Sequence, residues 1–190
     1  MRRAVFLDRD GVLVRDDDAR VPGPLSILPN VPAALRALHD AGFLLVVCTN
    51  QPIVARGTAT EADIAALHVQ IEAALRDQGA PSMTSWRVCP HHPNATLTAY
   101  RQDCRCRKPR PGLIEDAARD FDVDVGLSFM VGDRISDIEA GARAGCKTVQ
   151  VLSGAHAAPR IESPDAVVDV VPDFVALDLA QAAAWICAQP

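Results

Sequence analysis

Polar side chains that could carry phosphoryl chemistry directly follow three apolar runs of the 190-residue sequence. Short unbroken apolar runs indicate strands buried on both faces. In open α/β sheets, ligands bind just beyond the carboxyl ends of such strands. The sequence therefore predicts one site formed at a sheet edge by Asp8 and Asp10 after residues 5–7, Thr49 and Asn50 after residues 43–48, and Asp133 and Asp137 after residues 127–131.

These residue types suit the transfer of a phosphoryl group. Carboxylates from two strand ends offer the oxygen ligands that Mg²⁺ prefers. One Asp can attack phosphorus to give an aspartyl phosphate, and a second Asp two residues later can protonate the leaving alcohol and then activate water. Lys108 could offset the phosphoryl charge, and the hydroxyl and amide at residues 49 and 50 could bind its oxygens. Alone, Asp8-Arg9-Asp10-Gly11 would indicate only a strand followed by a polar turn.

The elements that must position these residues alternate between strand and helix. A strand–helix–strand pattern predicts a right-handed parallel crossover, which places residue 49 at the same sheet edge as Asp8. The pattern predicts a doubly wound, mostly parallel α/β sheet in one domain over residues 1–190. The predicted strands are residues 5–7, 43–48, 84–88, 127–131, 148–152 and 166–171. The predicted helices are residues 31–41, with Asn30 as cap, 60–79, 112–121, 135–145 and 174–187, and the predicted loops are 15–29 and 52–59.

The amino-acid composition limits the kinds of partner that the protein is expected to bind. Hydrophobic residues make up 49% of the chain, and the formal net charge is −5. An acidic balance disfavours nucleic acid and membrane surfaces as partners, and no apolar run of about 18 residues is present. We expect a cytoplasmic protein that acts on a small molecule.

Residues 89–106 interrupt the alternation and contain a candidate metal site. Cys89, His91, Cys104 and Cys106 offer three thiolates and one imidazole, which is the ligand set of a closed structural Zn²⁺ site. The alternative is a loop with reduced thiols. His92 is adjacent, but the CPHHP pattern favours His91 as the ligand. The other three cysteines are expected to be small buried hydrophobic residues: Cys48, Cys146 and Cys187.

The four motifs FLDRDGVL, TNQ, RKP and VGDRISD, in this order, resemble those of the haloacid dehalogenase-like (HAD) phosphohydrolase superfamily. The resemblance implies that Asp8 is the nucleophile and Asp10 the general acid and base, with Thr49 and Lys108 stabilising the phosphoryl group. It also implies Mg²⁺ held by Asp8, the backbone carbonyl of Asp10, and Asp133. Asp137 would be a further contact to the metal or to its ligands.

The zinc loop resembles that of a subgroup without a separate cap domain, which contains the heptose 1,7-bisphosphate 7-phosphatases and the histidinol-phosphate phosphatases. The long segment between His91 and Cys104, and Arg56 in the run TNQ…ARG, favour the heptose branch. The resemblance implies that Asn50, Gln51, Arg56 and Arg107 contact the substrate. Arg107 could bind the second phosphate, because a guanidinium binds phosphate in a bidentate manner.

Three alternatives stay open. Pro52-Ile53-Val54 departs from the Ser and Gly expected after TNQ, which leaves the preference between the α and β heptose anomers undecided. A histidinol-phosphate phosphatase is the second enzymatic hypothesis. A non-catalytic zinc-bearing interaction module is the hypothesis from another class. A small enzyme without a cap is compatible with a monomer.

Overall fold

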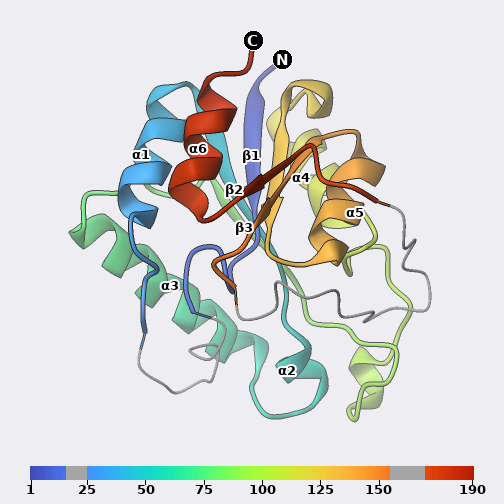
Figure 1. Ribbon diagram of the computed structural model, residues 1–190. Coiled ribbons are helices and arrows are strands. Elements are labelled where there is room, and N and C mark those ends of the chain that lie inside the picture. The colour runs from blue at the N-terminus through green and yellow to red at the C-terminus, as the bar shows by residue number, and fades with distance from the viewer. Residues whose placement is uncertain (16–24, 155–169) are drawn as a thin grey trace.

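The computed structural model describes residues 1–15, 25–154 and 170–190, in which the strands form one six-stranded sheet (Figure 1). The strand order is β3-β2-β1-β4-β5-β6, and all neighbouring pairs are parallel. The predicted doubly wound α/β fold is therefore confirmed. The strands are β1 (Arg3–Leu7), β2 (Phe43–Asn50), β3 (Ser85–Cys89), β4 (Phe129–Gly132), β5 (Lys147–Val151) and β6 (Phe174–Ala176).

Helices cover both faces of the sheet (Figure 1). Helices α1, α3 and α6 pack on one face, and α4 and α5 on the other. The helices are α1 (Val31–Asp40), α2 (Pro52–Ala55), α3 (Glu61–Asp77), α4 (Gly112–Phe121), α5 (Ile135–Ala144) and α6 (Leu179–Cys187), with 3-10 turns η2 (Thr98–Tyr100) and η3 (Val125–Leu127). Within the described ranges, no helix has the length and apolar character needed to cross a membrane.

The central strand β1 shows why the sheet is buried on both faces. Val5 and Leu7 join the core under α1, α3 and α6, whereas Ala4 and Phe6 join the core under α4. All four side chains are fully buried. Such a strand reads as a continuous apolar run, because parallel sheets are covered by helices on both faces.

Strand register brings the predicted catalytic residues to one edge. Leu7 pairs with Val47 of β2 and with Val131 of β4. The segments that begin at Asp8, at residue 49 and at Asp133 therefore lie beside one another at the carboxyl end of the sheet. In Figure 1 this end is at the bottom, away from the two chain termini and on the same side as α2.

Local signals set most helix ends. Thr60 and Asp63 form a capping box at the start of α3, with the Asp63 amide donating to Thr60 Oγ1 over 3.1 Å. Gly42 follows α1 with φ of 88°, as expected of a glycine after a helix. Asn30 occupies the predicted N-cap position of α1, but it has φ of 65° and its side chain makes no capping hydrogen bond.

Other expectations need correction. The predicted loop 52–59 contains the short helix α2. The predicted helix 174–187 is strand β6 followed by α6, which begins after Asp178 caps it by accepting from the Gln181 amide. Cys187 is exposed rather than buried. The predicted strand 166–171 lies mostly outside the described residues.

Candidate active site

A buried lysine forms the base of the site. Lys108 Nζ donates to Asp8 Oδ1 and to the Cys48 carbonyl oxygen, both over 2.7 Å, and pairs with Asp137 Oδ1 at the same distance. Lys108 is only 4% exposed and Asp8 6%, so water does not screen these contacts. The three partners come from the ends of β1 and β2 and from the first turn of α5.

The surroundings of Lys108 keep it charged. Burial alone would lower the pKa of the ammonium, but the carboxylates of Asp137 and Asp8 raise that pKa above its ordinary value. Burial raises the pKa of Asp137 to about 6, although Lys108 acts in the opposite direction. A protonated Lys108 therefore stands beside the proposed nucleophile.

A carboxylate cluster adjoins this lysine. Oxygens of Asp8, Asp133 and Asp137 all lie within 4.8 Å of one another. Asp137 can approach this closely because residue 132 is glycine, whose missing Cβ would collide with the Asp137 side chain. Gly11, with φ of 79°, similarly leaves room for Asp133. Three hard oxygen donors at this spacing fit a divalent cation such as Mg²⁺.

Asp10 is held by two neighbours on the other side of the site. Arg9 donates Nε to Asp10 Oδ1 and Nη2 to Asp10 Oδ2, both over 2.9 Å. Gln51 Nε2 donates to Asp10 Oδ2 and to Thr49 Oγ1, also over 2.9 Å. Burial raises the pKa of Asp10 above its ordinary value, although Arg9 partly offsets this effect. A carboxyl group with a raised pKa is suited to donate a proton.

Asn50 uses both ends of its amide on the Lys108 backbone. Its Nδ2 donates to the Lys108 carbonyl oxygen over 3.0 Å, and its Oδ1 accepts from the Lys108 amide over 3.1 Å. The end of β2 is thereby joined to the segment that carries Lys108. Asn50 positions Lys108 in addition to lining the cleft above it.

A cleft of about 400 Å³ opens above these residues. It brings together eight residues predicted from the sequence: Asp8, Asp10, Asn50, Gln51, Arg56, Arg107, Lys108 and Asp137. Thr49 and Asp133 do not line the cleft; they are 1% and 0% exposed and lie behind its wall. Three basic groups not given a role from the sequence complete this region: His92 and Arg134 in the cleft wall, and Arg9 beneath it.

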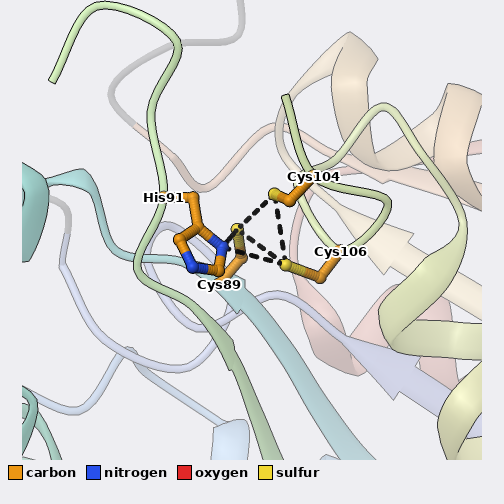
Figure 2. Close-up of side chains that lie close together, drawn as sticks. All are labelled: Cys89, His91, Cys104 and Cys106. Carbon is orange, nitrogen blue, oxygen red and sulfur yellow. Dashed lines mark hydrogen bonds between the residues drawn. The ribbon is translucent and has the colours of Figure 1, made fainter. Parts of the chain in front are cut away.

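The four predicted zinc ligands converge on one point (Figure 2). The three sulfurs are 3.2 to 3.5 Å apart, and His91 Nδ1 lies 3.8 Å from Cys89 Sγ and 3.4 Å from Cys106 Sγ. Tetrahedral Zn–S bonds of about 2.3 Å place sulfurs roughly 3.8 Å apart. Small outward shifts would therefore admit the ion, and the donor set fits structural zinc.

One thiol of the cluster already favours the charged form. Hydrogen bonding with Cys89, and secondarily with Cys104, lowers the pKa of Cys106 to about 5, against the effect of burial. The same contacts and burial raise the pKa of Cys89. A thiolate is the form that binds a metal ion.

The zinc loop is attached to the wall of the cleft. Leu97 N donates to the Ala55 carbonyl oxygen of α2 over 3.0 Å, and Tyr100 Oη donates to Glu61 Oε1 of α3 over 2.8 Å. Arg107 Nη1 donates to the His91 carbonyl oxygen over 3.4 Å. An ordered zinc loop therefore helps to hold two predicted substrate contacts in place: Arg56, which follows α2, and Arg107 itself.

The three basic residues that were given no role from the sequence differ in how clear a signal the sequence holds for them. Arg134 lies within the VGDRISD motif and His92 beside the predicted ligand His91, so their place in motifs was a usable signal. Arg9 is the largest fully buried side chain of the described residues, although arginine is normally exposed. Only its contact with His68 of α3, 59 residues away in the sequence, reveals its burial.

Comparisons with known proteins give the family of this chain. Residues 105–182 match a family model described as HAD-hydrolase-like. The chain is 45% identical to D-glycero-beta-D-manno-heptose-1,7-bisphosphate 7-phosphatase of Rhodopseudomonas palustris, over 76% of this chain and 80% of the relative. It is 37% identical to D-glycero-alpha-D-manno-heptose-1,7-bisphosphate 7-phosphatase of Burkholderia mallei, over 90% and 92%.

A solved structure extends the likeness to the whole fold. The D,D-heptose 1,7-bisphosphate phosphatase from B. bronchiseptica, in complex with magnesium and phosphate, superposes with a TM-score of 0.80 at 33% identity and covers 97% of each chain. These relatives are enzymes, which leaves the interaction-module hypothesis unsupported. The chain belongs to the HAD-like phosphoric monoester hydrolases, in the family of the heptose-1,7-bisphosphate 7-phosphatases.

Proposed function

We propose that this enzyme hydrolyses the 7-phosphate of D-glycero-D-manno-heptose 1,7-bisphosphate in a Mg²⁺-dependent reaction. One observation carries the proposal: the buried Lys108–Asp8 contact of 2.7 Å at the base of a cleft lined with arginines. The names of relatives that cover most of the chain support the choice of substrate. The product would serve the synthesis of nucleotide-activated heptose for surface glycans.

Asp8 is the proposed nucleophile. One of its carboxylate oxygens attacks the phosphorus, and the bond from phosphorus to the sugar oxygen breaks, leaving an aspartyl phosphate. Lys108, charged and 2.7 Å from Asp8 Oδ1, offsets negative charge on the transferring group. The Thr49 hydroxyl accepts a hydrogen bond from Gln51 Nε2 behind the cleft wall, and we propose that it donates its own proton to a phosphoryl oxygen of the bound substrate.

Asp10 is the proposed acid and base. It gives its proton to the departing sugar oxygen, and it then takes a proton from the water that attacks the aspartyl phosphate. Inorganic phosphate and free Asp8 result. Asp8, the Asp10 carbonyl and Asp133 would hold Mg²⁺, with Asp137 as an adjacent contact. Bound there, the cation would supply positive charge to the phosphoryl oxygens.

The remaining cleft residues are proposed to recognise the sugar and its second phosphate. Arg107 and Arg56 line the cleft with Asn50 and Gln51. A guanidinium can bind the 1-phosphate through two parallel hydrogen bonds. We propose further that residues 1–190 act as one domain, with the zinc loop inserted, in a cytoplasmic and monomeric enzyme that does not bind nucleic acid or membranes.

The test is a substrate panel that contains both anomers of heptose 1,7-bisphosphate and histidinol phosphate. We expect the highest kcat/KM with one of the heptose anomers, and ³¹P NMR should show that the phosphate on C1 remains. A higher kcat/KM with histidinol phosphate would replace the proposal with its alternative. Loss of the 1-phosphate instead would contradict the orientation of the substrate.

A further inference from the structure

The buried Arg9 links the cleft to a histidine that the reaction does not use directly. Its Nε and Nη2 hold the two oxygens of Asp10, and its Nη1 lies 3.2 Å from His68 Nε2. Arg9 is 0% exposed and His68 6%. A guanidinium can only donate hydrogen bonds, so His68 Nε2 must accept, and the His68 proton must reside on Nδ1.

His68 is itself held from the far side. Its ring stacks on Trp86 of β3, with centroids 4.4 Å apart and planes at 23°. Trp86 Nε1 donates to Glu72 Oε2 over 3.2 Å. Burial and, secondarily, the charge of Arg9 lower the pKa of His68 to about 3, so its ring stays neutral and able to accept.

We infer that His68 is a positioning residue for Asp10, acting through Arg9. This rests on the proposed function, which gives Asp10 the acid and base roles. Arg9 has a fixed fork of donors, and the two bonds to Asp10 set the plane of its carboxyl group. Gln51 Nε2 also donates to Asp10 Oδ2, but neither this bond nor the two Arg9 bonds fixes the guanidinium end of the Arg9–Asp10 unit. The third bond, to His68 on α3, anchors that unit to the body of the fold.

The effect of misplacing Asp10 on the rate should depend on the leaving group of the substrate. An alkyl leaving group such as a sugar oxygen needs a proton as it departs, whereas p-nitrophenolate departs without one. Misplacing Asp10 should therefore slow the alkyl ester far more than the aryl ester. A defect in packing or in phosphate binding would slow both esters alike, because they share the same phosphoryl group.

Two variants of His68 separate the effect of its hydrogen bond with Arg9 from the effect of its ring stacking on Trp86. His68→Phe keeps a ring to stack on Trp86 but offers no acceptor, whereas His68→Gln places a carbonyl oxygen near the position of Nε2. Trp86→Phe is the matched control, because it retains an aromatic face for His68 and removes the Nε1 hydrogen bond to Glu72, while the contact between Arg9 and His68 stays in place. Thermal unfolding of each variant verifies the fold, and His68→Leu, which also lacks an acceptor, keeps the test available if the Phe variant is unstable.

The measured quantity is kcat/KM, which reports the steps through departure of the leaving group, with heptose 1,7-bisphosphate and with p-nitrophenyl phosphate. Complete loss of general acid catalysis costs about 10²- to 10⁴-fold, so misplacement of the acid should cost roughly 10-fold or more. For His68→Phe we expect that fall with the heptose ester and a fall below about 3-fold with the aryl ester. His68→Gln and Trp86→Phe should stay within about 3-fold of wild type on both.

Equal falls on the two esters, or none, in His68→Phe would overturn the inference. Asp10→Asn, measured in parallel, distinguishes this outcome from failure of the proposed function. If Asp10→Asn also shows no dependence on the leaving group, the acid role of Asp10 fails. If the fall in kcat/KM depends on the leaving group in Asp10→Asn but not in His68→Phe, only the role of His68 fails.

Discussion

Replacement of Lys108 by Met should affect stability and catalysis together, because one ammonium serves both. Met is similar in length and keeps the buried aliphatic stem, but it removes all three polar contacts. Asp8 and Asp137, whose oxygens lie within 4.8 Å of each other, would then face one another without the charge between them. The variant isolates the effect of that charge.

The size of the effect follows from burial. Removing one partner of a buried ion pair typically costs about 3 to 5 kcal/mol, because the remaining charge stays desolvated. With Lys108 only 4% exposed, water cannot take its place without rearrangement. Loss of a donor aimed at the transferring group lowers kcat by about 10²- to 10³-fold. Added Mg²⁺ should recover part of the stability, because it binds the folded carboxylate cluster.

The assay combines urea unfolding at pH 7, with and without Mg²⁺, and steady-state phosphate release. The matched control is Lys147→Met, at the only other lysine in the sequence, which donates to Gln189 over 3.0 Å at the sheet surface. It should change stability by less than about 1 kcal/mol and leave kcat unchanged. A Lys108→Met enzyme that loses less than about 1 kcal/mol, or keeps a tenth of its kcat, would refute the reasoning.

Two further perturbations test the zinc cluster and the neutral His68. Purified protein should hold about one equivalent of zinc by metal analysis, and Cys106→Ser should lose most of it; metal-free protein with an ordered loop 89–106 would contradict the structural role. Folding lowers the pKa of His68 to about 3, whereas the unfolded chain binds a proton at this residue below about pH 6.5. The contribution of the neutral His68 to the free energy of unfolding is therefore fully present above about pH 6.5 and declines as the pH falls. Between pH 7 and pH 5, wild type should lose about 2 kcal/mol more than His68→Gln in urea unfolding, and equal losses would contradict a neutral buried ring.

The central part of the fold and most of the site could be predicted from the sequence. Buried parallel strands are continuous apolar runs, and the polar residues that end them must meet at one edge; hence Asp8, residue 49 and Asp133 were placed correctly relative to one another. The zinc ligands were predictable because three thiols and an imidazole at this spacing form the ligand set of a structural zinc site.

What escaped prediction depends on tertiary packing or on very short elements. Helix α2 has four residues, too few to show helical periodicity. Strand β6 has three residues, and its apolar run continues into that of α6, so only the Asp178 cap marked the boundary. The burial of Arg9 depends on the distant His68, and no local pattern indicates that an arginine between two aspartates lies inside the protein.

The most direct test of the central claim is to locate the phosphoryl group on the enzyme during turnover. Heptose 1,7-bisphosphate labelled with ³²P at the 7-phosphate is mixed with enzyme, quenched in acid within milliseconds, and digested for mass spectrometry. We predict label on the peptide that contains Asp8, and neither label nor phosphate release in Asp8→Asn. Label on another residue, or undiminished phosphate release by Asp8→Asn, would contradict Asp8 as the nucleophile.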